Sequence, residues 1–432
     1  MAAALSPGSG FEEHFTGGTL RVDLLHRGNA HGASFSVARV VSEVAWSGPR
    51  HTGVGPLGLG PARYRIVDPS SSKDLYGRGY ATVFLEWITT AEGKGAPRTF
   101  EESVRIPEPR RPIELALDVR EAAGWREVFR LGIDPRASSV DRSGPRKVGR
   151  VASVGPSGDP TSRLDILLLG DGYRAGERAK FNAVCAEARG WLLAVDPFKS
   201  RADGINFWSL HVPSPRSGIS DFAEVEAVRD NAFGFHYHAF GLPRYVITYE
   251  DRRLREAAAQ VPYDAVIILL NQERYGGGGI YNLWSTCAAH NGLAPYLLVH
   301  EFGHNLAALA DEYYTSAVAY EDVNPPEVEP WEPNITALHD PARLKWKDLV
   351  KRRVPIPTPW SQDEYDAADG KTRPRLLAIE RYRGRVGAFE GGGYRAKGIY
   401  RPEIDCIMFS RGAPTFCAVC ERHLARVIDS YK

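Results

Sequence analysis

The chain has no long hydrophobic run and almost no net charge. Its strongest apolar run, Val266 to Leu270, is far shorter than the roughly 18 residues that a membrane-spanning helix needs. Lysine and arginine number 54 against 53 aspartate and glutamate, which leaves a formal net charge of +1. We therefore expect no membrane span, and the charge balance gives no general reason to expect nucleic acid or an anionic membrane as a partner.

Cysteine is scarce, and its number is odd. The five cysteines are Cys185, Cys287, Cys406, Cys417 and Cys420. This is too few for a disulfide-dense scaffold, and at least one thiol must stay free or pair outside the chain. The N-terminus, MAAALSPGSG, has neither a basic segment nor a long apolar segment. We expect either a cytosolic protein or a chain that starts after a removed signal.

The first third of the chain has the pattern of β-strands. Residues 19–25, 81–87 and 112–119 alternate apolar and polar side chains, and turns rich in Gly, Pro and Ser separate them. A length of 432 residues favours two domains. We predict an antiparallel β-sandwich over residues 1–140. A segment rich in Pro, Ser, Gly and Arg follows from Pro135 to Ser162, and we place a linker at 141–162.

The rest of the chain alternates strands with helices. A buried strand at 164–169 leads to Gly170-Asp171-Gly172, a helix is predicted at 177–195, and further strands are predicted at 205–212 and 265–270. This alternation favours a mixed α+β or α/β domain over residues 163–432.

One motif in this domain carries chemistry: His300-Glu301-Phe302-Gly303-His304. Positions i and i+4 share a helix face, so both imidazoles can reach one metal ion, and Glu301 lies where a carboxylate can take a proton from metal-bound water. The alternative is an ordinary amphipathic helix with two surface histidines. The apolar segment Ala294 to Val299 argues against it, because two buried histidines without a ligand would be costly.

A catalytic zinc needs a third protein ligand. Asp311 follows His304 by seven positions, which is about 10 Å along a continuous helix and too far to bind the same ion. If Asp311 is the ligand, the helix must end near Leu309, although no glycine stands there to make the turn. Glu312 and Glu321 are the alternative carboxylates.

Two further features accompany the motif. Met408 is the one methionine besides the initiator, and it is either a core gap-filler or the apolar floor of a metzincin Met-turn. The run Gly276 to Gly279 is either a flexible loop or a cleft rim along which an extended peptide lies. The second interpretation makes Gly277 and Gly278 candidate substrate-binding residues.

Several segments together resemble the IgA-peptidase family of metzincin-like metallopeptidases. They are HEFGHNLAALADEYY at 300–314, Leu169 to Tyr173, Tyr275 to Tyr281, Gly398 to Pro402, and Phe416 to Cys420, while Thr19 to Asp23 and Gly79 to Trp87 resemble that family's N-terminal β domain. The family usually carries glycine where Ala308 stands.

The resemblance implies a secreted or periplasmic zinc endopeptidase acting on a protein or peptide, with a metzincin-like catalytic domain. Zinc would be held by His300, His304 and Asp311, and Glu301 would be the general base. It does not imply that immunoglobulin is the substrate, because substrate choice depends on loops. Tyr313, Tyr314 and Tyr400 are candidate donors to the oxyanion.

Two questions stay open at this point. Cys406, Cys417, Cys420 and His423 have the spacing of a structural zinc site, but an oxidising compartment slightly favours a disulfide from Cys406 to Cys417 or Cys420, and free buried thiols are the third option. The functional alternatives are a zinc-containing glycan- or protein-binding module without catalysis, and a non-haem iron oxygenase with two histidines and a carboxylate. Neither alternative needs Glu301.

Overall fold

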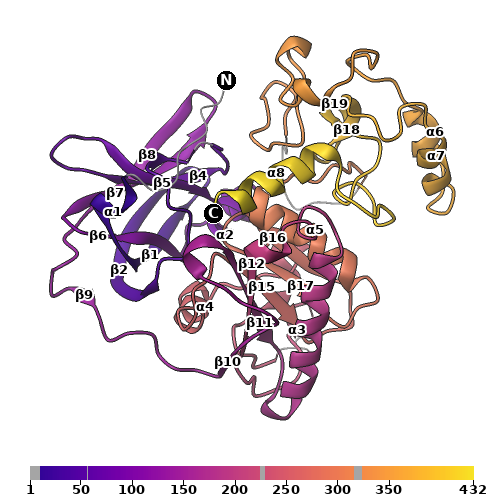
Figure 1. Cartoon of the computed structure of the whole chain (residues 1–432). Coiled ribbons are helices and arrows are strands. Elements are labelled where there is room, and N and C mark those ends of the chain that lie inside the picture. Colours follow the sequence, from indigo (N-terminus) through magenta and orange to yellow (C-terminus); the bar gives the residue numbers. More distant parts are fainter. Residues whose placement is uncertain (1–9, 56, 224–228, 316–323) are drawn as a thin grey trace.

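The computed structural model describes residues 10–55, 57–223, 229–315 and 324–432 (Figure 1). The first part of the chain contains two sheets and two short helices. In chain order these elements are α1 Phe11–His14, β1 Phe15–Asn29, β2 Gly32–Ala45, β3 Gly53–Val54, β4 Ala62–Val67, β5 Asp74–Tyr80, α2 Val83–Trp87, β6 Arg98–Pro109, β7 Ile113–Glu121, β8 Gly124–Ile133 and β9 Val140–Asp141.

The two N-terminal sheets share one hydrophobic core. Their strand orders are β6-β1-β2-β9 and β3-β5-β4-β7-β8, and most neighbours are antiparallel. Alternate residues of a strand point to the same face. Leu20, Val22 and Leu24 of β1 therefore lie in the same core as Ile66 of β4 and Leu115 of β7.

The predicted strand at 81–87 is wrong, because Val83–Trp87 forms the helix α2. The Thr82 hydroxyl accepts a hydrogen bond from the Leu85 backbone N–H at 3.2 Å, which caps the helix. Phe84 and Trp87 are both buried and stand three positions apart, the spacing of one helix face. The alternating pattern of this segment hid that spacing.

The second part of the chain is built on a six-stranded sheet of order β10-β12-β11-β15-β17-β16. The four central strands are parallel, and both edge strands are antiparallel to their neighbours. The helices and strands of this part of the chain are β10 Arg150–Ser153, β11 Leu164–Asp171, α3 Arg178–Leu193, β12 Ile205–His211, β13 Ser220–Asp221, β14 His236–Tyr237, α4 Asp251–Ala258, β15 Ala265–Leu270, β16 Gly277–Ile280, β17 Trp284–Ala288 and α5 Ala294–Ala307.

Both faces of this sheet are covered, which explains its continuous apolar strands. In β15, Ile267 and Leu269 pack into the core that includes residues of α3 and α5, while Val266 and Ile268 pack on the opposite side with residues of α4. The segment expected to be a linker contributes to the fold, since β10 pairs with β12 along the sheet edge.

The remaining elements lie above one end of the sheet, in orange and yellow in Figure 1. They are α6 Gln362–Ala367, α7 Arg373–Ile379, β18 Phe389–Gly392, β19 Arg395–Arg401 and α8 Ala418–Asp429. In the described ranges, no helix combines the length and the apolar character needed to cross a membrane.

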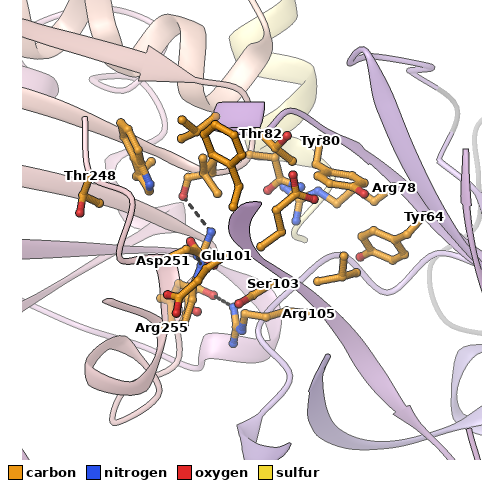
Figure 2. A pocket seen from close by; sticks show the side chains of 18 of the residues that line it. Tyr64, Arg78, Tyr80, Thr82, Glu101, Ser103, Arg105, Thr248, Asp251 and Arg255 are labelled. Carbon is orange, nitrogen blue, oxygen red and sulfur yellow. Dashed lines mark hydrogen bonds and ion pairs between the residues drawn. The ribbon is translucent and has the colours of Figure 1, made fainter. Parts of the chain in front are cut away.

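The two parts of the chain meet around a cavity of about 60 Å³ (Figure 2). Arg105 of β6 reaches across this junction, donates a hydrogen bond to the Tyr263 carbonyl and lies 3.7 Å from the Tyr263 ring centroid. Arg78 of β5 donates to the Tyr431 hydroxyl at 2.7 Å, which ties the C-terminus to the first part. The junction is therefore held by charged and aromatic groups.

Candidate active site

The HExxH motif lies on α5, which ends directly after it. Pro295 stands in the first turn, where its missing N–H is no loss, and the helix ends at Ala307. Ala308 adopts the left-handed conformation with φ 54° and ψ 34°, and its N–H donates to the His304 carbonyl at 3.0 Å. The chain thus turns back toward the histidines as the helix geometry required, with alanine where glycine is usual.

This turn brings Asp311 to both histidines. The Nε2 atoms of His300 and His304 are 3.2 Å apart, and they lie 3.0 and 3.3 Å from Asp311 Oδ1. His300 and Asp311 are buried, and His304 is partly exposed. The three sequence-predicted ligands therefore converge on one point.

The hydrogen bonds on the far side of each ring determine what this point can hold. His300 Nδ1 faces the Ile407 carbonyl at 3.0 Å, and His304 Nδ1 faces the Leu309 carbonyl. A carbonyl only accepts, so each Nδ1 carries the proton and each Nε2 presents a lone pair. Asp311 Oδ1 has no hydrogen-bond donor among the described residues. Three acceptors that converge in this way fit a cation.

The charges around the site support this conclusion. Burial lowers the pKa of His304, but the Asp311 carboxylate outweighs burial and raises it to about 9. Burial raises the pKa of Asp311, but the two histidines outweigh it and hold that pKa well below its usual range. The site stabilises positive charge, whether a proton or a metal ion supplies it.

A hollow of about 440 Å³ opens onto these residues. Glu301 lines it beside the two histidines, and burial raises the pKa of the Glu301 carboxyl while the histidine charges oppose that rise. A carboxylate held here can exchange a proton with a molecule bound next to the two histidines and Asp311.

The edge strand β16 forms one wall of the hollow. Gly277, Gly278 and Gly279 all line it, so the flexible-loop interpretation of the glycine run is wrong. A Cβ atom on Gly279 would lie 2.2 Å from the Glu301 carbonyl oxygen, so glycine is required for the strand to approach α5 this closely. The outer edge is already paired at Gly277, whose N–H donates to the Arg244 carbonyl at 3.1 Å.

The N-terminal part of the chain supplies another wall. Ala81, Leu85, Glu86 and Thr89, from α2 and its flanks, line the same hollow as the histidines. The Ala81 N–H donates to the carbonyl of Tyr281, directly after β16, at 2.9 Å. This segment therefore lines the hollow directly beside the strand β16.

The three predicted tyrosines are in different places. Tyr313 lines the hollow and stacks on the His300 ring, with centroids 6.1 Å apart and an interplanar angle of 14°. Tyr314 points away and donates to Asp366 at 2.8 Å. Tyr400 pairs through its backbone with Thr336 and is not among the residues that line the hollow.

Tyr394 and Arg244 are among the residues that line the hollow but were not predicted from the sequence. The Tyr394 hydroxyl donates a hydrogen bond to Asp311 Oδ2, and its backbone N–H donates to the Tyr313 carbonyl at 3.0 Å. The preceding run Gly391-Gly392-Gly393 was the available signal for Tyr394. No local pattern marked Arg244.

Met408 lies directly against the motif helix. A Cβ atom on Gly303, the residue before His304, would come within 3.1 Å of the Met408 sulfur, so the Met408 side chain packs on α5 at the motif. Its neighbour Ile407 supplies the carbonyl that holds His300. The Met408 segment therefore packs against the motif helix and orients the His300 ring.

Of the two alternative carboxylates, the one in the described part of the chain, Glu312, does not join this cluster. Glu312 turns away to Cys406, Cys417 and Cys420, and Glu321 lies outside the described residues. All five cysteines are free thiols in the structure, so the slightly favoured disulfide is not formed there. The fourth residue beside the three cysteines is Glu312 and not His423.

Comparison with known families places these features together. A family described as IgA Peptidase M64 matches residues 153–375 and 367–428, and one described as Peptidase M64 N-terminus matches residues 10–130. No curated protein matches the chain. The two matches cover most of its length, including the convergent histidines and aspartate and both walls of the hollow, and they show that the chain belongs to the IgA Peptidase M64 family and is a peptidase.

Proposed function

We propose that the protein is a zinc-dependent endopeptidase that uses Glu301 as its general base. The observation that carries this proposal is the convergence of His300 Nε2, His304 Nε2 and Asp311 Oδ1, three acceptors between which the described residues place no donor. Two histidines, one carboxylate and an open hollow have the composition of a catalytic zinc site, which keeps one position free for water.

A bound zinc ion would lower the pKa of a bound water to about 7 and would polarise the scissile carbonyl. Glu301, which lines the hollow beside the two histidines, would accept a proton there and pass it to the leaving amine. The Nδ1 protons of His300 and His304, held by backbone carbonyls, keep both rings oriented. Tyr313 and Arg244 line the same hollow and are the candidate donors to the developing oxyanion.

The architecture supports a metzincin-like catalytic domain. An antiparallel edge strand beside an HExxH helix, a carboxylate returned by a sharp turn, and a methionine beneath the helix are the parts that such a domain combines. We divide the chain into a β-sandwich at 1–140, a connecting segment at 141–162 and the catalytic domain at 163–432. We also keep a secreted or periplasmic location as a proposal.

The substrate is proposed to be an extended peptide lying along β16. Main-chain pairing at a sheet edge tolerates many sequences, so side pockets would set specificity. The edge is already paired at Gly277, which leaves the Gly278 and Gly279 end of the strand as the place for this pairing.

The test is a proteome-wide cleavage-site profile of the wild-type protein, with Glu301→Ala and Glu301→Gln as controls. We expect the variants to lose peptide cleavage while keeping the metal bound at the histidines, because Glu301 is not a ligand. Substantial turnover in either variant would refute the mechanism. A wild-type protein that binds but never cleaves would favour the binding-module alternative, and iron in place of zinc would favour the oxygenase.

A further inference from the structure

A second cluster of metal-binding side chains lies behind the active site. Cys406 precedes Met408 by two residues, Cys417 caps the N-terminus of α8, Cys420 lies in its first turn, and Glu312 follows Asp311. One donor atom from each of these four residues lies within 4.8 Å of every other. All four are buried, and Cys406, Cys420 and Glu312 are fully inaccessible.

The Glu312 carboxylate is incompletely satisfied in this environment. Its Oε1 atom accepts from Asn334 Nδ2 at 3.0 Å and lies 3.1 Å from Cys420 Sγ. Its Oε2 atom has no hydrogen-bond partner in the described part of the chain. A buried acidic group that is left partly unpaired destabilises a fold, so this arrangement calls for a further partner.

Two of the three sulfurs accept backbone hydrogen bonds, and the sulfurs of Cys417 and Cys420 also lie 3.7 and 3.1 Å from Glu312 Oε1. Cys406 Sγ receives the backbone N–H groups of Cys417 at 3.1 Å and Met408 at 3.4 Å, and Cys417 Sγ receives that of Cys420 at 3.5 Å. Backbone N–H groups and a helix N-terminus both favour the thiolate over the thiol. Sulfurs held in this way are prepared to bind a cation.

We propose that Glu312, Cys406, Cys417 and Cys420 bind a structural zinc ion, separate from the catalytic metal. Three thiolates and one carboxylate are four protein ligands, the number that a structural zinc site uses to leave no open position. The ion offsets two of the four negative charges and gives Glu312 Oε2 a partner. Arg401, fully buried nearby, adds a further positive charge.

The alternative states of these residues explain less. A disulfide joins two of the sulfurs and leaves the third sulfur and the Glu312 carboxylate enclosed together. Free thiols leave Oε2 without a partner. Only a cation satisfies all four groups at once, and thiolates select zinc over harder ions such as magnesium or calcium.

This second site would brace the catalytic one through two backbone segments. Glu312 is covalently next to Asp311, and its N–H donates to the Met408 carbonyl at 2.8 Å. Cys406 precedes Ile407, whose carbonyl orients His300. The ion would therefore join the segment that carries the third catalytic ligand to the segment that holds the first.

The first measurement uses the wild-type protein, purified without chelator. Metal analysis should give two zinc equivalents per chain, and thiol titration of the denatured, unreduced protein after zinc removal should give five thiols. X-ray absorption should show zinc–sulfur distances of about 2.3 Å. One zinc equivalent, or a thiol count reduced by a disulfide, would overturn the proposal without affecting the catalytic site.

Variants then assign each ion. His300→Ala with His304→Ala should retain one zinc equivalent with three sulfur ligands and one oxygen ligand. Cys417→Ser with Cys420→Ser should lose that equivalent, while Cys185→Ala, a buried cysteine outside the cluster, should keep both ions. Cobalt loaded into the histidine variant should show sulfur-to-metal charge-transfer absorption. A residual ion without sulfur ligands would contradict the assignment.

Discussion

Replacing Gly279 by alanine tests how the strand β16, which lines the hollow, is fixed to the helix α5 that carries the HExxH motif. The added Cβ would lie 2.2 Å from the Glu301 carbonyl oxygen and 2.9 Å from His304 Cβ, whereas ordinary contacts begin near 3.4 Å. The nearest obstacle is helix backbone and cannot rotate away. Strand β16 must therefore retreat from α5 by about 1 Å, or α5 must shift by a similar distance.

Both responses have a measurable size. Overpacking a well-filled interior costs about 1–3 kcal/mol, and backbone obstacles favour the upper part of that range. A displacement of about 1 Å between catalytic groups and substrate can lower the rate by about 100-fold. We expect Gly279→Ala to lower the free energy of unfolding by about 2–3 kcal/mol and kcat/KM by one to two orders of magnitude, with the catalytic metal retained.

The assay is denaturant unfolding together with peptide-cleavage kinetics, and two glycines serve as controls. The three atoms nearest to a Cβ on Gly278 all belong to the Tyr245 side chain and none to the backbone, so Gly278→Ala should be milder. Gly132 in β8 has no atom near its Cβ position, so Gly132→Ala should be nearly neutral. Wild-type stability and activity in Gly279→Ala would refute the argument that this close approach positions the cleft.

Three further predictions concern the ligands and the domain junction. Asp311→Ala should remove the zinc equivalent that lacks sulfur ligands, whereas Glu312→Ala should remove the sulfur-bound one, and metal analysis with X-ray absorption would contradict us if both variants lost the same ion. Tyr394→Phe removes a donor to Asp311, so metal affinity measured by chelator competition should fall about 10- to 100-fold, and an unchanged affinity would show that this contact is unimportant. Burial, reinforced by the charge of Asp165, raises the pKa of Asp264 to about 7. The protonated carboxyl therefore contributes its full stability below its ordinary pKa, and this stability is lost as the pH rises through about 7. Asp264→Asn should therefore unfold at a higher temperature than the wild type at about pH 8 but not at about pH 4, and equal differences at both pH values would contradict this assignment.

The convergence of His300, His304 and Asp311 was predictable because their spacing follows from helix geometry. His300 and His304 share a face at any helical position, and the 1.5 Å rise per residue requires the helix to end before Asp311 can bind. Ala308 meets that requirement with φ 54° although its residue type gave no signal. The buried strand β15 could be predicted equally well, because a parallel strand covered on both faces is apolar throughout.

The errors arose where tertiary contacts decide. Val83–Trp87 alternates like a strand, yet the Thr82 cap and the burial of Phe84 and Trp87 make it a helix. Tyr394 reaches Asp311 from 83 positions away, a pairing that only the folded chain reveals. The position of Glu312 also depends on the folded chain. Its residue type suggested a ligand beside the histidines, but after the turn at Ala308 the Asp311 side chain lies with the histidines and the Glu312 side chain lies with the three cysteines.

The wall formed by Ala81, Leu85, Glu86 and Thr89 has a consequence for how this enzyme can be dissected. A fragment beginning at residue 150 would keep the sheet, the motif helix and every proposed metal ligand, yet its cleft would be open on one side. Tyr245 would lose the Glu86 carboxylate to which its hydroxyl donates, next to the strand on which a peptide is proposed to lie. We expect such a fragment to keep the proposed metal ligands but to bind substrates weakly. Exchanging the N-terminal region between relatives should therefore transfer substrate preference along with it.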